Sequence, residues 1–138
     1  MIKDHRFIEW AKVYNHFYGT PKSTFEKQIH RGRDVILTID PQGALSIRKI
    51  YPQGVFIFVV PPTWGTLLKR LKRRGTDDQL SLKIRIKNAK KEIRMVSHYD
   101  YVVVNDKLNQ AIEDVAAILR AEHMKRDRIN KRDVPILR

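Results

Sequence analysis

Three short apolar runs constrain the fold of this chain more than any other feature of its sequence. They occupy residues 35–40, 55–60 and 101–105 and are rich in Val, Ile and Phe. A nearly continuous apolar run of five or six residues is typical of a strand that is buried on both faces, as in a parallel sheet between layers of helices. We therefore expect an α/β fold with a parallel sheet.

Helical patterns lie between these runs. Thr20-Pro21 and Asp40-Pro41 each combine a capping residue with a first-turn proline, so a helix is expected to begin at each pair, and Gly32 is expected to end the first one. Apolar residues three and four apart predict three more helices, along the stripes Trp64, Leu67, Leu68 and Leu71, then Leu82, Ile86, Ala89 and Ile93, then Leu108, Ile112, Val115 and Leu119. Residues 80–87 also alternate with period two, so a strand is the alternative to a helix there.

The length and composition of the chain suit one compact domain inside the cell. It has 138 residues, 42% of them apolar, and it contains no cysteine, which excludes a disulfide scaffold and thiolate chemistry. The longest uncharged stretch, residues 50–68, contains three prolines and two glycines, so we expect no membrane helix. No leader pattern precedes the first folded segment, and we expect a cytoplasmic protein.

Positive charge is concentrated in one part of the chain. The formal net charge is +13, and residues 69–94 hold 11 basic and 3 acidic residues. Such a cluster attracts phosphate groups, whether in nucleic acid, lipid or a nucleotide, so we expect nonspecific binding of polyanions. The alternative is a solvated helical face without a partner.

Three arginines form the candidate site that the residues themselves suggest. Arg70, Arg74 and Arg85 bracket residues 75–78, between two predicted helices that follow an apolar run. Phosphoryl transfer needs such cations, because charge spreads over the oxygens of the migrating group. No glycine is followed by lysine, so the sequence has no Walker A loop, and no histidine has metal-ligand spacing.

Six motifs in order resemble the guanylate kinases, which transfer a phosphoryl group from ATP to GMP. The resemblance extends from about residue 6 to residue 122. Its motifs are Phe7-Ile-Glu-Trp-Ala11, Tyr18-Gly-Thr20, Ile39-Asp-Pro-Gln-Gly43, Pro61-Pro62, Arg70-Leu-Lys-Arg-Arg-Gly-Thr76 and Val104-Asn-Asp106.

The resemblance implies a role for each matching residue. For GMP it implies Glu9 at the guanine edge, Thr20 at the base and Tyr18 at the phosphate. It also implies Asp40, at the second of two acidic positions of the family at the end of the apolar run 35–40. For ATP it implies Arg70, Arg74 and Arg85 as catalytic arginines on the phosphates and Asn105 near the adenine. Mg²⁺ is implied as the companion of ATP, with no metal site on the protein, and Thr38 stands where the family has another acidic residue.

The part of the family that precedes these motifs is not in this sequence. Guanylate kinases begin with a strand, a Gly-rich phosphate loop and a helix, followed by further GMP-binding residues. The resemblance therefore implies a P-loop-kinase-like parallel-sheet core with a helical lid, incomplete because it lacks the phosphate-loop strand. Within one domain we expect the remainder of the GMP region at 1–33, core elements at 34–68, the lid and the next helix at 69–94, a core strand and helix at 95–124, and a basic tail at 125–138.

The function that follows is guanylate kinase chemistry, with weak nucleotide binding and no activity in this chain alone. The alternatives are a non-catalytic guanylate-kinase-like binding module and a remnant that binds protein or nucleic acid through its basic surface. The absent strand would lie between residues 35–40 and 55–60, so its place is expected to be filled by residues 6–11, by a second copy of the chain, or by a complementing N-terminal fragment.

Overall fold

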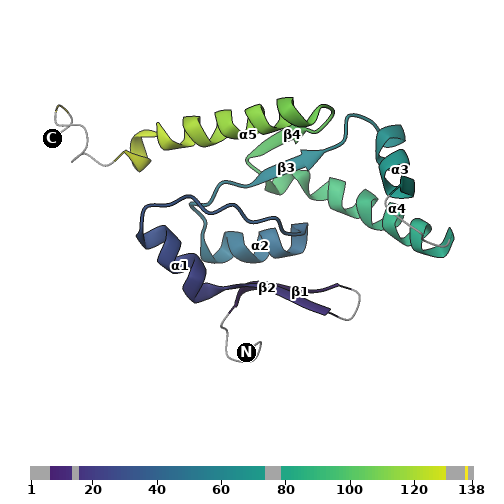
Figure 1. The fold of residues 1–138 in the computed structure, drawn as a ribbon, viewed down its shortest axis with the longest axis horizontal. Coiled ribbons are helices and arrows are strands. Elements are labelled where there is room, and N and C mark those ends of the chain that lie inside the picture. Colours follow the sequence, from purple (N-terminus) through teal and green to yellow (C-terminus); the bar gives the residue numbers. More distant parts are fainter. Residues whose placement is uncertain (1–6, 14–15, 74–78, 130–135, 137–138) are drawn as a thin grey trace. The chain divides into compact units, whose positions relative to one another are not determined.

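The computed structural model describes residues 7–13, 16–73, 79–129 and 136. The chain forms two compact units, Met1–Gly54 and Val55–Arg138, and each is described by itself (Figure 1). Among the described helices, none is long and apolar enough to cross a lipid bilayer. The segment boundaries expected from the sequence stay predictions.

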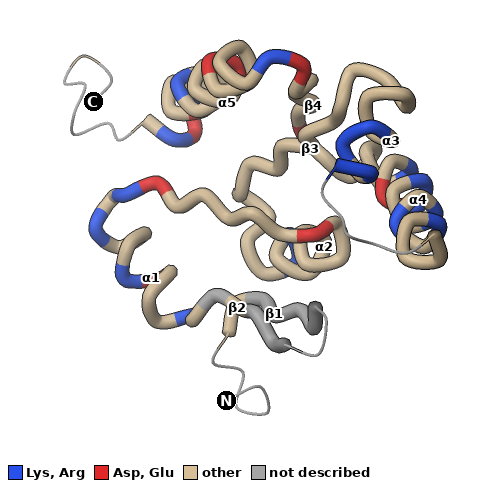
Figure 2. Tube along the Cα trace, turned by 45° about the vertical axis from the view of Figure 1, so that its right-hand side comes forward, with Lys and Arg blue, Asp and Glu red and all other residues tan. Residues whose placement is uncertain are grey.

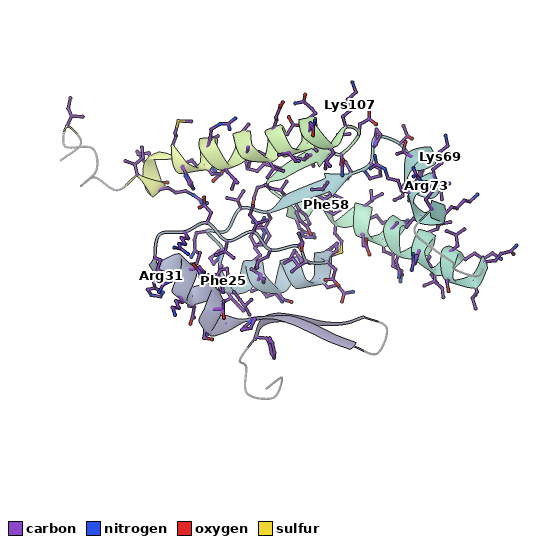
Figure 3. The ribbon with its side chains drawn as sticks, in the orientation of Figure 1. Phe25, Arg31, Phe58, Lys69, Arg73 and Lys107 are labelled. Carbon is purple, nitrogen blue, oxygen red and sulfur yellow. The ribbon has the colours of Figure 1, made fainter. Side chains whose placement is uncertain are left out.

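The first unit consists of a hairpin and two helices. Strands β1 (Phe7–Val13) and β2 (His16–Pro21) pair in antiparallel orientation, followed by α1 (Lys22–His30) and α2 (Pro41–Ile50). Its buried residues come from both kinds of element: Ile8, Phe25, Ala44 and Ile47. The ring of Phe25, which is labelled in Figure 3, meets Tyr51 edge to face at 5.1 Å between centroids. The sequence had not predicted this hairpin.

The helix ends of the first unit test the capping predictions. Asp40 caps α2 as expected, because its Oδ1 accepts a hydrogen bond of 2.7 Å from the Gly43 N–H. Gly32 follows α1 with a φ of 69°, and its N–H donates to the Ile29 carbonyl at 2.9 Å. The cap expected at Thr20 is wrong, because β2 continues through Pro21 and Pro21 is itself the residue before α1.

The strand expected at residues 35–40 is also wrong. Residues 33–40 have no regular secondary structure, and neither described sheet includes them. Their burial alternates as in a strand, with half-buried Val35, Leu37 and Ile39 between exposed neighbours such as Ile36. A strand needs a neighbour that completes its backbone hydrogen bonds, and within the described residues this segment has none. Residues 7–11, one candidate for filling the sheet, pair with β2 instead.

The second unit contains the predicted parallel sheet. Strand β3 (Ile57–Val60) pairs with β4 (Tyr101–Val104) in parallel register, Phe58 opposite Val102 and Val60 opposite Val104. The helices are α3 (Trp64–Arg73), α4 (Gln79–Ile93) and α5 (Leu108–His123), with short 3₁₀ turns η1 (Arg94–His98) and η2 (Arg126–Arg128). Residues 79–93 are thus helical, and the strand alternative for 80–87 is excluded.

The core of the second unit lies around the sheet. Phe56, Phe58, Val103 and Ala111 are buried, and Phe58 meets Tyr99 edge to face at 4.8 Å between centroids (Figure 3). Other sheet residues remain open: the side chain of Val59 is 54% exposed. Among the described residues, β3 has a strand partner along one edge only, which is β4.

One buried carboxylate holds the end of α5 in place. Glu122 is 2% exposed, and its Oε1 accepts a hydrogen bond from the Tyr101 hydroxyl at 2.5 Å and lies 2.6 Å from Lys125 Nζ. Arg128 Nη2 lies 3.2 Å from Oε2 at ion-pair distance, although Oε2 has no aligned hydrogen-bond donor among the described residues. These contacts join β4, α5 and the first residues of the basic tail.

Candidate functional site

Arg70 connects α3 to the loop that follows β4. The helix α3 begins directly after β3 and Pro61-Pro62, and Thr63 opens it by accepting the Thr66 N–H at its Oγ1, 3.0 Å away. Two turns later, the half-buried Arg70 donates from Nη1 to the Asn105 carbonyl at 2.7 Å and from Nη2 to the Asp106 carbonyl at 3.3 Å. The guanidinium fork therefore holds two successive peptide groups of this loop.

Asn105 is fixed from two sides. Its N–H donates to the Val60 carbonyl at 2.7 Å, which continues the ladder of the parallel sheet, while its carbonyl accepts from Arg70. Asn105 therefore lies at the carboxyl ends of both strands, which is where open α/β sheets bind their ligands. The structure thus brings together Arg70 and Asn105, which are 35 positions apart in sequence and were both assigned to the ATP side.

The other two arginines of the candidate site are placed less directly. Arg85 is a half-buried residue in the first half of α4. Arg74 lies outside the described residues, as do residues 75–78. The structure therefore joins Arg70 with Asn105 and leaves the grouping of all three arginines as a prediction.

A groove that sequence reasoning missed lies at the carboxyl end of β3. It has a volume of about 500 Å³ and combines the ring of Trp64 with two cations. Its lining residues are Val60, Pro61, Pro62, Thr63, Trp64, Lys90, Ile93 and Arg94. The usable signal in the sequence was the position of Pro61 and Pro62 immediately after an apolar run, because residues that follow a parallel strand line the ligand edge of the sheet.

The residues assigned to GMP all belong to the first unit. In the β1–β2 ladder, Glu9 lies opposite Thr20, and Tyr18 lies opposite Ala11, two positions further along the hairpin. The hairpin thus brings Glu9 close in register to Tyr18 and Thr20, which follow it by 9 and 11 residues in sequence. Asp40 is exposed and serves as the cap of α2, so the carboxylate has a structural role already.

The charge around the second-unit site is strongly positive. Figure 2 shows blue positions along α3 and α4, and in the described residues 64–73 and 79–94 there are ten Lys and Arg side chains against one acid, Glu92. Lys69 and Arg73 extend from α3 into solvent (Figure 3). No group of three or more His, Asp or Glu residues gathers as a metal site within the part of the chain that the structure describes.

Comparison with known proteins gives one consistent result. The guanylate kinase family model matches residues 1–122. A guanylate kinase of Caldanaerobacter subterraneus is 47% identical over 128 residues, covering 93% of this chain and 62% of the relative. One of Oceanobacillus iheyensis is 44% identical over 137 residues, covering 99% and 66%. The chain thus spans somewhat less than two thirds of the length of these curated relatives.

A solved structure shows the same fold. The crystal structure of guanylate kinase from Anaplasma phagocytophilum superposes with a TM-score of 0.75 at 33% identity, covering 96% of this chain and 64% of that one. The parallel β3–β4 sheet with its flanking helices is therefore the core of a P-loop kinase fold, as the resemblance implied.

Proposed function

Because this chain belongs to the guanylate kinase family, we propose that it carries the ATP-side and part of the GMP-side binding groups of an enzyme that transfers the γ-phosphoryl group of ATP to GMP. The observation that supports this most directly is the link between Arg70 and Asn105 at the carboxyl ends of β3 and β4. A cationic side chain and an amide are held there by backbone contacts, at the edge of the sheet where nucleotide ligands bind.

The proposed roles follow the chemistry of the two nucleotides. Glu9 accepts hydrogen bonds from the guanine N1–H and 2-amino groups, Thr20 contacts the base and Tyr18 the phosphate, and Asp40 is a further residue of the GMP side. Arg70, Arg74 and Arg85 stabilise the charge on the phosphates during transfer, and Asn105 contacts the adenine. Mg²⁺ supplied with ATP neutralises phosphate charge. We infer a cytoplasmic location, because the enzyme needs the ATP and GMP pools of the cell.

We propose that the 138 residues alone are inactive. They contain no loop of the Walker A type, which places backbone N–H groups and a lysine on the β- and γ-phosphates. Loss of positioning together with charge stabilisation costs several orders of magnitude in rate. A coupled assay of ADP formation should therefore give background values with the purified chain, and turnover above about 1 s⁻¹ would contradict the proposal.

The same assay tests a complementing fragment. β3 has one edge without a strand partner among the described residues, and Val59 on it is half exposed. We infer that a strand from an N-terminal family fragment, or from a second copy of this chain, pairs there. Adding the N-terminal third of the Caldanaerobacter relative should restore GMP-dependent ADP formation, whereas light scattering that shows a dimer, without restored activity, would favour the second copy.

Guanine recognition has its own test. Glu9→Gln replaces one acceptor oxygen by a donor that opposes the guanine N–H groups, so GMP affinity measured by calorimetry should fall at least tenfold while ATP affinity stays unchanged. Equal GMP affinity in Glu9→Gln and in the unmodified chain would remove Glu9 from the site without touching the family assignment.

A second candidate function, binding of polyanions, is favoured by the charge of α3 and α4. Ten cations face a single acid in these described segments, and a non-catalytic binding protein of this family could use them. Retention on heparin that disappears between low and physiological salt supports it, because phosphate-like contacts release counterions. Retention on heparin no stronger than that of a neutral protein would exclude it.

A further inference from the structure

Several cations of α4 and the first residue of η1 lie on one side of the helix, whereas Arg85 lies on the opposite side. Lys83, Lys87, Lys91 and Arg94, called the α4 row below, follow one another at intervals of four, four and three residues and are all exposed. With 100° per residue these positions fall within about 80° of arc. Glu92, the one acidic residue of α4, lies nine residues after Lys83 and therefore about 180° around the helix from it.

Within the described residues, this arrangement leaves the cations of the row without an acidic partner. None of its four side chains takes part in an ion pair with any other residue that the structure describes. Lysines four residues apart on a helix repel one another, and an ordinary solvated helix relieves this by alternating acids with bases. A row without acids is instead suited to an extended anion.

The spacing of the row matches a nucleic-acid backbone. At 1.5 Å of rise per residue, the distance from Lys83 to Arg94 along the helix axis is about 16 Å. One strand of a duplex carries a phosphate for about every 3.4 Å of axis, so about five phosphates lie within that length. We propose that the α4 row binds the phosphate backbone of double-stranded nucleic acid without reading its sequence. This proposal names the partner for the polyanion-binding function given above, and it rests on that function.

Two features favour a duplex over other polyanions. Single-strand binding uses aromatic side chains on which bases stack, and α4 contains no aromatic residue. Insertion into a membrane surface uses a free apolar helix face. On α4 the apolar stripe Leu82, Ile86 and Ala89 is half-buried, and α4 contacts α3. The exposed Leu80 and Ile84 lie about 60° and 100° around the helix from Lys83, within and beside the arc of the row, so they form no apolar face separate from the cations.

The test compares two variants with the same net charge. The row variant combines Lys83→Gln, Lys87→Gln, Lys91→Gln and Arg94→Gln. The control variant combines four exposed substitutions elsewhere: Lys27→Gln, Arg31→Gln, Lys49→Gln and Arg120→Gln. Each lowers the formal charge from +13 to +9. Glutamine forms helices nearly as well as lysine, so helicity is retained and is checked by circular dichroism.

Fluorescence anisotropy with labelled 20-base-pair DNA and RNA duplexes gives the readout. If four phosphates are contacted, log affinity falls with log salt at a slope of about −3.6, which is a loss of roughly 100-fold between 50 and 200 mM salt. At 50 mM salt the row variant should bind at least tenfold more weakly than the control variant, with a shallower slope.

Several results would overturn the proposal. Equal affinities of the two variants would mean that net charge alone acts, and the row would then have no role even if heparin binding by the whole chain persists. Tighter binding of a single strand than of a duplex would show that the chain contacts bases and not only phosphates. Row-dependent binding of vesicles with 30% anionic lipid, without duplex binding, would identify a membrane partner instead.

Discussion

Replacing Arg70 should loosen the loop after β4 and destabilise the second unit. In Arg70→Gln the side chain is shorter and no longer reaches both the Asn105 and Asp106 carbonyls. The bond to Asn105 has an ideal length of 2.7 Å and a charged donor, whereas the 3.3 Å bond to Asp106 is at the weak end of the range. Hydrogen bonds with a charged partner contribute about 1.5–3 kcal/mol. Since Arg70 is only half-buried, the lower end of this range applies.

The expected loss of about 1.5 kcal/mol corresponds to a decrease of roughly 6 °C in the unfolding midpoint of a domain of this size. Thermal unfolding followed by circular dichroism measures it, and hydrogen exchange of the Asn105 amide, which donates to Val60, reports on the loop directly. Arg73→Gln is the matched control: it makes the same chemical change on the same helix, at an exposed residue, and should cost less than about 0.5 kcal/mol. Equal midpoints and equal Asn105 protection in the two variants would refute the anchoring role of Arg70.

The remaining predictions concern the cap of α2 and the buried carboxylate of α5. Asp40→Ala should cost about 1 kcal/mol of unfolding free energy, because the Gly43 N–H loses its acceptor, and Asp40→Asn should cost less than half of that. Hydrogen bonds from Lys125 and then from Tyr101 lower the pKa of Glu122 below its ordinary 4.5, so its contribution to stability is present above that pH and is lost as the pH falls through the folded-state value. Glu122→Gln should therefore flatten the acid side of a midpoint-versus-pH curve; an unchanged acid side would contradict this. The hydrogen bonds to Glu122 raise the pKa of Tyr101 and of Lys125, so stability should also decrease above pH 10, and Tyr101→Phe should remove part of that decrease.

Local signals were sufficient for the positions of the helices and for two of the three strands expected in the parallel sheet. The stripe that begins at Leu82 and the cap at Asp40 act within one or two turns of the chain, and the structure places α4 and α2 where they indicated. The apolar runs at residues 55–60 and 101–105 contain the strands β3 and β4, as predicted. These elements depend on burial of their own residues, which composition and periodicity report.

Sequence patterns failed where the structure depends on a partner. The run at residues 35–40 has the alternation of half-buried and exposed residues that a strand shows, but whether it joins a sheet depends on a neighbouring strand, which its own sequence does not specify. The β1–β2 hairpin was missed for a related reason, since Tyr14-Asn15 between the strands is not one of the Asn-Gly or Gly-Gly pairs that signal a tight turn.

The contact between Arg70 and the carbonyls after β4 could not be read from any local pattern. Helical spacing had grouped Arg70 with Arg74 as two phosphate-binding residues. In the structure the Arg70 guanidinium instead donates hydrogen bonds to the backbone carbonyls of Asn105 and Asp106. A guanidinium has five N–H donors, so these two bonds leave others for a phosphate. Arg70 can thus be both a positioning residue for the loop and a phosphate ligand, and the anchoring part is the one that sequence reasoning missed.

The division of the chain into two units has a consequence for its function. Every residue proposed for GMP lies in the first unit, and every residue proposed for ATP lies in the second: Glu9, Tyr18, Thr20 and Asp40 on the one hand, Arg70, Arg74, Arg85 and Asn105 on the other. On these proposed roles, substitutions of the first-unit residues are expected to act on GMP affinity and substitutions of the second-unit residues on ATP affinity. Transfer of the phosphoryl group depends in addition on alignment of the reacting atoms, which binding by itself does not provide. On the proposed roles, the chain is expected to retain weak nucleotide binding and to lack turnover, so calorimetry and the coupled assay answer different questions about it.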